Sequence, residues 1–339
     1  MLAAAARRAV RSQAAPSGEA GLTLLARGLS SSAPSLKEEE PPGHPGTIDF
    51  GFQHVPREEK ETLVGEVFTS VSSSYDVMND LMSGGMHRVW KDRLVEKLRP
   101  RPGQRHLDVA GGTGDVAFRV LDAMRTAQYG SAGSAHGGGS FAAGGAAAAP
   151  AAAGEPPAAG GSAAGGAAAG PSQQLPAVTV CDINASMLAE GRRKAEARGI
   201  GPESVQWVEG NAEQLPFDSG VFDSYTVAFG IRNVTDRPAA LREAHRVLRP
   251  GGRLLCLEFS KVVVPGMQQL YDLYSFNVIP QIGRVVAGDA ASYQYLVESI
   301  RMFPDQESWA GMIEDAGFRG VDYENLTFGV VAIHSGFKL

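Results

Sequence analysis

Hydrophobic positions follow two alternating patterns along most of the chain. Short apolar runs, typical of buried strands, occupy 107–110, 177–181, 205–209, 222–229 and 252–259. Stretches with helical spacing lie between them, as in 115–124, where residues 116, 117, 120, 121 and 124 are apolar. This alternation predicts an α/β fold with a parallel sheet that is covered by helices on both faces.

A glycine-rich turn follows the first of these strands. Residues 107–115 are LDVAGGTGD, so three glycines separate the strand from the helix predicted over 115–124. Glycine lets the backbone approach a ligand closely because it has no Cβ, and a helix N-terminus presents unpaired N–H groups. The turn therefore predicts a site for a small molecule.

Two kinds of ligand are compatible with this turn. Residues 112–117 match the permissive form G-x-G-x-x-A of the dinucleotide fingerprint, which favours a pyrophosphate. Asp115, at the helix start, would repel a pyrophosphate but suits a ligand that carries a cationic sulfonium and an amino group. A tight turn without a ligand is the third interpretation, and the stability cost of three glycines argues against it.

Polar residues follow the next two strands. Asp182 ends the run 177–181, where the carboxylate of a doubly wound sheet binds both ribose hydroxyls of a nucleotide. Capping of the following helix is the alternative role for Asp182. Asn211 follows the run 205–209 and can both donate to and accept from an adenine edge, with the backbone N–H of Ala212 as a second contact.

Eight segments, in order, resemble a known family. They are LDVAGGTGD, VCDINASML, GNAEQLPF, AFGIRNV, HRVLRPGGRLLCLEFS, YDLYSFNVIP, SYQYLVESI and AIHSGFKL. Together they resemble the ubiquinone and menaquinone biosynthesis C-methyltransferase family, in its mitochondrial benzoquinol form, over residues 47–339 apart from one insertion. The resemblance implies a class I S-adenosylmethionine-dependent methyltransferase fold, which is Rossmann-like. Its seven-stranded, mostly parallel sheet has an antiparallel C-terminal strand.

The resemblance implies S-adenosylmethionine as the cofactor and assigns its contacts. Carried over residue by residue, these contacts fall on Thr113, Asp182, Asn211 and Ala212, in agreement with the interpretation of the turn and the strand ends. Gly112 and Asp108 complete the expected cofactor site. No metal is expected.

C-methylation of a benzoquinol needs a phenolate, because the ionised oxygen pushes electron density onto the neighbouring ring carbon. A protein group must therefore accept or relay a proton, or stabilise the anion. Arg232 and Asn233 follow the run 222–229 and are placed for this role. A guanidinium is a poor base, with a pKa above about 12, so we expect Arg232 to stabilise the phenolate and orient a water that takes the proton.

Tyr75 completes the predicted catalytic set, and the family resemblance implies the same three residues. Two alternatives stay open at this stage. Arg232 can be a plain surface or sheet-edge charge, and Tyr75 can be a core tyrosine.

Residues 262–304 are rich in apolar and aromatic side chains. They include Tyr271, Leu273, Tyr274, Phe276, Val278, Ile279, Ile282, Val285, Val286, Tyr293 and Tyr295. The pattern fits a wall for a polyprenyl tail and fits equally a hydrophobic cap packed on the sheet; the resemblance favours the tail. His87 and Trp90 are candidates for the mouth of the same site, although a lone histidine of this kind is more often structural.

Composition narrows the function classes. A net charge of -6 and a pI near 5.7 argue against nucleic acid as a partner. Cys181 and Cys256 lie in predicted strands without nearby cysteine or histidine partners, which argues against a zinc site and a disulfide framework. No run of about 18 apolar residues is present that would span a membrane.

Two segments are not expected to form part of the folded methyltransferase domain, which is predicted over residues 46–339: one precedes this domain and the other interrupts it. Residues 1–45 combine four early arginines with alanine and serine. This composition is typical of a transit peptide followed by a disordered linker, and it favours a mitochondrial over a plastid destination. An ordinary disordered tail is the alternative. Residues 128–174 are mostly Gly, Ala, Ser and Pro. We expect them to form a disordered insertion in a single methyltransferase domain.

The resemblance also implies partners and a location. It implies that the substrate is a polyprenyl methoxybenzoquinol of ubiquinone biosynthesis. It further implies that the enzyme associates peripherally with the matrix side of the mitochondrial inner membrane and belongs to a multi-subunit ubiquinone-biosynthesis complex; a homodimer is also compatible.

Three other functions stay open at this stage. One is a plastid naphthoquinol methyltransferase, and another is a catalytically silent cofactor-binding scaffold. The third is a nicotinamide dehydrogenase, which is disfavoured because no Tyr-x-x-x-Lys pair follows the fingerprint.

Overall fold

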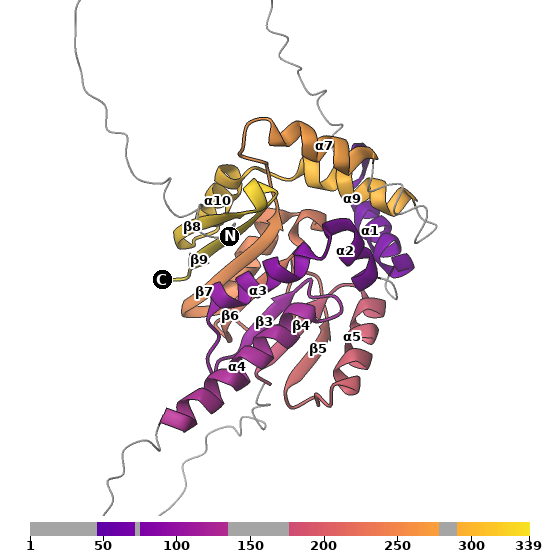
Figure 1. Ribbon diagram of the computed structural model, residues 1–339. Coiled ribbons are helices and arrows are strands. Elements are labelled where there is room, and N and C mark those ends of the chain that lie inside the picture. Colours follow the sequence, from indigo (N-terminus) through magenta and orange to yellow (C-terminus); the bar gives the residue numbers. More distant parts are fainter. Residues whose placement is uncertain (1–45, 72–74, 135–175, 278–289) are drawn as a thin grey trace, which may run out of the picture. The chain divides into compact units, whose positions relative to one another are not determined.

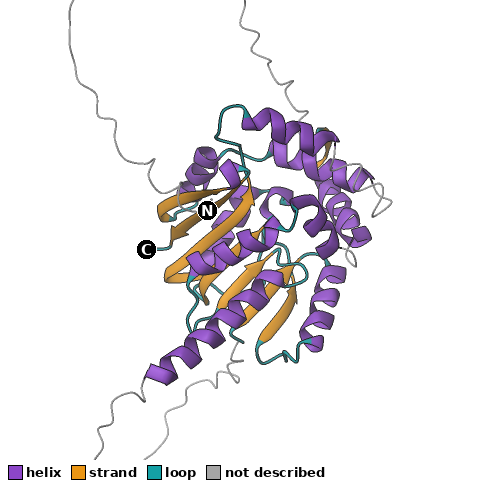
Figure 2. Ribbon diagram, viewed as in Figure 1, coloured by secondary structure: helices purple, strands orange, loops and turns teal. Residues whose placement is uncertain are grey.

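The computed structural model describes residues 46–71, 75–134, 176–277 and 290–339. These residues form a seven-stranded sheet with flanking helices and a separate two-stranded sheet (Figure 1, Figure 2). The strands of the large sheet are β3 (His106–Val109), β4 (Val178–Asp182), β5 (Val205–Glu209), β6 (Phe222–Ala228), β7 (Leu248–Phe259), β8 (Arg319–Leu326) and β9 (Val331–Phe337).

The strand order is β5-β4-β3-β6-β7-β9-β8. Neighbouring strands from β5 to β7 are parallel, whereas β9 is antiparallel to both β7 and β8. The predicted seven-stranded, mostly parallel sheet with an antiparallel C-terminal strand is therefore confirmed. One boundary differs from the apolar pattern: β7 begins at Leu248, which pairs with Phe222 ahead of an irregular register shift.

Alternate side chains of the strands feed two hydrophobic cores. In β7, Leu255 and Leu257 pack on the face of α3 (Met86–Leu98), α4 (Asp115–Ser134) and α5 (Ala185–Ala197). Leu254 and Cys256 pack on the opposite face, against α6 (Arg237–Val247) and α10 (Gln306–Asp315). This is the two-residue period of a strand that is buried on both sides. Both cysteines are buried and free.

Further helices gather beside the carboxyl ends of the parallel strands. They are α1 (Arg57–Val71), α2 (Tyr75–Ser83), α7 (Met267–Asn277) and α9 (Ala290–Met302), seen together in Figure 1. The small sheet of β1 (Thr47–Phe50) and β2 (Gln53–Pro56) is tied to α9, because Phe50 stacks on Tyr295 at 4.3 Å and the N–H of Phe52 donates to Glu298 at 3.0 Å.

The predicted low-complexity block starts later than the composition indicated. Residues 128–134 belong to α4, because a helix that is nucleated and packed on the sheet propagates into residues of moderate propensity. The rest of this block and residues 1–45 lie outside the described residues. Among the helices that the structure describes, none is both long and apolar enough to cross a bilayer.

Candidate active site

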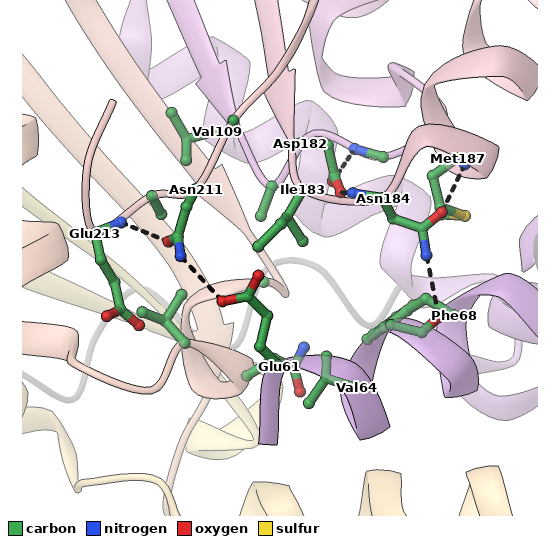
Figure 3. A pocket seen from close by; sticks show the side chains of 18 of the residues that line it. Glu61, Val64, Phe68, Val109, Asp182, Ile183, Asn184, Met187, Asn211 and Glu213 are labelled. Carbon is green, nitrogen blue, oxygen red and sulfur yellow. Dashed lines mark hydrogen bonds between the residues drawn. The ribbon is translucent and has the colours of Figure 1, made fainter. Parts of the chain in front are cut away.

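A cavity of about 110 Å³ lies at the carboxyl ends of the parallel strands, and we call it the strand-end cavity. Residues from the strand ends form one side, and α1 forms the other with Glu61, Val64 and Phe68 (Figure 3). Six predicted site residues line it: Tyr75, Gly112, Asp182, Asn211, Ala212 and Asn233. The folding of the chain thus brings together residues from five separate segments.

Asp182 is fixed by the backbone on both carboxylate oxygens. Oδ2 accepts from the N–H of Gly112 and Oδ1 from the N–H of Asn184, each at 2.8 Å. Asn184, and not Asp182, caps α5 by accepting from the N–H of Met187, so the capping interpretation of Asp182 is wrong. Burial raises the pKa of Asp182 despite these bonds. Each oxygen keeps a lone pair that can accept a hydroxyl.

Two asparagines connect the strand ends to α1. Asn211 accepts from the N–H of Glu213 at 2.8 Å and donates to Glu61 at 3.2 Å (Figure 3). Asn184 donates to the carbonyl of Gly65 at 3.2 Å. The sequence does not reveal α1 as a cavity wall, because its apolar pattern is weak and its polar residues resemble those of an ordinary exposed helix.

The backbone is strained around the strand-end cavity. Ala110 and Phe229, which follow β3 and β6, have left-handed conformations with φ of 50° and 59°. Gly112 has φ of 54°, and a Cβ there would lie 3.0 Å from Cε of Met187. Left-handed residues other than glycine cost about 1 kcal/mol or more each and cluster at functional sites.

A second, smaller cavity of about 30 Å³ is lined by the other residues that were predicted to bind the cofactor. Asp108 and Thr113 line it with Lys91 and Asp115. Asp115 is bound by Lys91 at 2.9 Å and by Arg119 at 3.2 Å. Burial opposes its ionisation, but the two cations outweigh burial and lower the pKa of Asp115 to about 2. Its charge is therefore largely balanced within the protein, contrary to the expectation that it faces a cationic ligand.

Asp108 ends a buried chain of hydrogen bonds through the sheet. The hydroxyl of Thr226 donates to its Oδ1 at 2.7 Å, while Oδ2 is buried without a partner among the described residues. Because that hydroxyl has one hydrogen, Nε2–H of His106 must donate to Thr226, across 3.0 Å. Burial raises the pKa of Asp108 to about 7.

A third cavity, of about 280 Å³, lies between α2, α3, η1 (Ile231–Asn233), α7, α9 and η2 (Thr327–Gly329), and we call it the apolar cavity. Its apolar walls come from Met82, Met86, Trp90, Phe229, Phe259, Leu296, Ile300 and Val330. Tyr75, His87, Trp90, Arg232 and Tyr274, all predicted from the sequence, border it. Tyr75 borders both this cavity and the strand-end cavity.

The predicted aromatic segment contributes to the site only in part. Tyr274 borders the apolar cavity, Tyr293 and Tyr295 border a small cavity of about 30 Å³ beside it, and Leu273 is exposed. Five predicted members lie outside the described residues: Val278, Ile279, Ile282, Val285 and Val286.

Arg232 is buried and paired, so its interpretation as a surface charge is wrong. It is 5% exposed, and its Nη1 donates to Oε1 of Glu258 at 3.1 Å and to the carbonyl of Phe229. In the described chain, Nε and Nη2 make no hydrogen bond. Glu258, which is 1% exposed, was missed because a single acid within an apolar strand gives no catalytic pattern.

Asn233 is oriented by a tyrosine. The hydroxyl of Tyr295 donates to its Oδ1 at 3.0 Å, which leaves the amide hydrogens free to face the strand-end cavity. Burial raises the pKa of Tyr295 to about 12, so this hydroxyl stays a donor. Among the described residues, no group of three or more His, Cys, Asp or Glu side chains is arranged to hold a metal ion.

Comparison with known proteins identifies the family. Residues 55–338 match the model of the ubiE/COQ5 methyltransferase family. The chain belongs to this family. The protein is therefore a methyltransferase, and the dinucleotide interpretation of the glycine turn is not supported.

Named relatives of this methyltransferase occur in distant eukaryotes. The 2-methoxy-6-polyprenyl-1,4-benzoquinol methylase, mitochondrial, of Arabidopsis thaliana is 51% identical over 297 residues, which cover 87% of this chain and 92% of that one. The human protein of the same name is 54% identical over 290 residues, which cover 86% and 84% of the two chains.

The elevated pKa of Asp108 predicts a pH-dependent cost to stability. Between about pH 4 and pH 7 the folded protein keeps this proton while the unfolded chain loses it, so stability falls as pH rises. The unfolding free energy of Asp108→Asn minus that of the wild type should therefore be about 1 to 3 kcal/mol larger at pH 8 than at pH 5. Urea unfolding at both pH values measures this.

Asp122→Asn, on the exposed side of α4, is the control for Asp108→Asn. Its difference from the wild type should stay constant between the two pH values. A constant difference for Asp108→Asn as well would show that Asp108 is ionised in the folded protein at pH 5.

Proposed function

We propose that this methyltransferase transfers a methyl group from S-adenosylmethionine to a ring carbon of a polyprenyl methoxybenzoquinol in ubiquinone biosynthesis. One observation carries the proposal: Tyr75 borders both the strand-end cavity, which Asp182 and Asn211 line, and the apolar cavity, which Arg232 lines. Donor and acceptor can therefore meet beside one residue. The names of the relatives support the choice of substrate.

The residues of the strand-end cavity fit the proposed methyl donor. Asp182 is held with lone pairs free for the two ribose hydroxyls, and Asn211 and Ala212 would contact the adenine. Gly112, Thr113 and the unpaired Oδ2 of Asp108 surround the turn, where the amino-acid part would lie. When bound, S-adenosylmethionine supplies an electrophilic methyl group on a sulfonium.

The residues of the apolar cavity fit the proposed acceptor. Glu258 holds Nη1 of Arg232, so Nε and Nη2 are left as preorganised donors for a phenolate and for a water that takes its proton. Tyr75 and Asn233 would orient the ring. With the quinol bound, the apolar walls would exclude bulk water, which would strengthen the interaction of Arg232 with the anion.

The size of the apolar cavity suits the quinol ring better than a long tail. Its volume of about 280 Å³ lies at the lower end for ligand pockets. Met86 and Tyr274 border it and are 37% and 36% exposed, so they form part of an apolar mouth. We infer that the polyprenyl tail leaves through this mouth into a membrane, with which the enzyme would associate peripherally.

We further infer the cellular setting and the domain boundaries from the sequence and the relatives. Residues 1–45 would act as a mitochondrial transit peptide and linker, and residues 135–174 would form an insertion in the methyltransferase domain. The mature enzyme would work on the matrix side of the inner membrane, in a ubiquinone-biosynthesis complex or as a homodimer.

Turnover with methyl-labelled S-adenosylmethionine tests the proposed function. Protein without residues 1–45 should transfer label to a short-tailed methoxybenzoquinol and much less to a naphthoquinol. Faster labelling of the naphthoquinol would favour the plastid alternative. Cofactor binding without transfer to either quinol would favour the silent scaffold.

Asp182→Ala tests the assignment of the ribose site. It removes a charged acceptor from two hydroxyls and should weaken S-adenosylmethionine binding by about 1.5 to 3 kcal/mol in isothermal titration. Asp122→Ala, which changes an exposed carboxylate, should leave the affinity unchanged. Wild-type affinity in a folded Asp182→Ala protein would refute the assignment.

Arg232→Lys tests the stabilisation of the phenolate. An ammonium cannot reproduce the planar, two-pronged contact, so kcat should fall by about 100-fold while cofactor affinity stays unchanged. Higher pH should restore part of the rate, because it ionises the quinol in solution. Arg242→Lys, exposed on α6, is the control. Unchanged kcat with a raised KM for the cofactor would instead assign Arg232 to the cofactor site.

A further inference from the structure

His87 is the only histidine among the described residues that border the apolar cavity. It lies on α3 and is 6% exposed. Its Nε2 is 2.8 Å from Oδ1 of Asp80 on α2. Its Nδ1 is buried and has no hydrogen-bond partner in the part of the chain that the structure describes. A buried imidazole with one nitrogen held and the other unpaired is thus part of the wall.

Asp80 fixes the tautomer of His87. Arg88 donates to both oxygens of Asp80, at 2.7 and 2.6 Å. The hydrogen bonds from Arg88 and His87 hold the pKa of Asp80 well below its usual range, so it is an ionised acceptor. Nε2 of His87 must therefore carry the hydrogen, and Nδ1 keeps a lone pair. A carboxylate that orients an imidazole is the arrangement found in many general bases.

Other polar groups of the apolar cavity are unsuited to accept a proton. Arg232 is permanently protonated. Lys91 donates to Asp115 at 2.9 Å, and Tyr274 donates its hydroxyl to the carbonyl of Met82 at 3.1 Å. Tyr75 is a phenol, which is a much weaker base than an imidazole.

We propose that His87 is the proton acceptor of the methylation and that Asp80 is its positioning residue. This inference rests on the proposed function. Nδ1 takes the hydroxyl proton of the quinol, directly or through the water that Arg232 orients. Arg232 and His87 border the same cavity. Arg232 can therefore stabilise the developing phenolate while His87 accepts its proton.

The step balances without any further reactant. The O–H electron pair stays on oxygen, the neighbouring ring carbon bonds to the methyl carbon, and the electrons of the C–S bond return to sulfur. The methylated carbon then loses its hydrogen to solvent as a proton, which restores the aromatic ring. The phenolate oxygen recovers its proton from the imidazolium, so one proton is released for each methyl group transferred.

The charges around His87 favour a neutral imidazole. Burial lowers its pKa most, and the hydrogen bond with Asp80 opposes this. Lys91 on the same helix lowers the pKa further, whereas Asp115 at the start of α4 raises it. Arg88 is bound to Asp80, and Arg232 faces the same cavity. The net shift is downward, so His87 is able to accept a proton at neutral pH.

His87→Gln tests the proposal by its rate and its pH profile. In the wild type, kcat/KM should rise with pH through the pKa of His87, since only the neutral ring accepts a proton. In His87→Gln this acidic limb should be lost, and kcat should fall by about 10²-fold or more. S-adenosylmethionine affinity should not change, because His87 does not border the strand-end cavity.

His54→Gln is the matched control. His54 also pairs with a carboxylate, Asp49, at 3.1 Å, but it is exposed and borders neither cavity. It should keep the wild-type rate and pH profile. If His87→Gln also keeps kcat and the acidic limb while the wild type methylates the quinol, His87 is not the acceptor. A wild type that binds cofactor but methylates no quinol would overturn the proposed function and this proposal together.

Asp80→Asn and a direct titration keep the proposal testable if His87→Gln does not fold. Loss of the carboxylate should lower the pKa of His87, so the acidic limb of Asp80→Asn should move to lower pH. In the folded wild type, NMR titration of the His87 ring should give the same pKa as the limb. If the acidic limb of the kcat/KM profile does not move in Asp80→Asn, and its pKa differs from that of the His87 ring, His87 is not the proton acceptor.

Discussion

The proposed chemistry of the apolar cavity depends on the buried ion pair between Arg232, in η1 after β6, and Glu258, near the end of β7. Burial of two charges is costly, and removal of one partner from such a pair typically costs about 3 to 5 kcal/mol. A contribution to stability alone is therefore a weak explanation for this buried ion pair. It holds a guanidinium with two nitrogens unengaged beside aromatic walls, where an anion would be strongly stabilised.

The same region holds other features that stability alone would not favour. Ala110 and Phe229 are strained, and Oδ2 of Asp108 is buried without a partner in the described chain. The Nδ1 atom of His87 is likewise unpaired. These features lie around adjacent cavities that share Tyr75, as expected where local strain is maintained for function and is offset by two well-packed cores.

The sequence predicts those parts of the site that depend on local pattern. The apolar runs and the glycine turn predicted the strand ends, and the choice of Asp182 and Asn211 followed from their positions at the end of β4 and after β5. Glu258 and the wall formed by α1 were not predictable, because both depend on contacts between distant segments. The partner of His87 lies seven residues away, across the turn between α2 and α3, and only the fold reveals that pairing.

A crystal structure with S-adenosylhomocysteine and a short-tailed methoxybenzoquinol tests the central claim most directly. The ribose should bind Asp182, and the quinol ring should lie in the apolar cavity beside Tyr75, with one ring oxygen about 3 Å from Nη2 or Nε of Arg232. A quinol bound outside the apolar cavity, or one whose oxygens do not reach Arg232, would contradict the account.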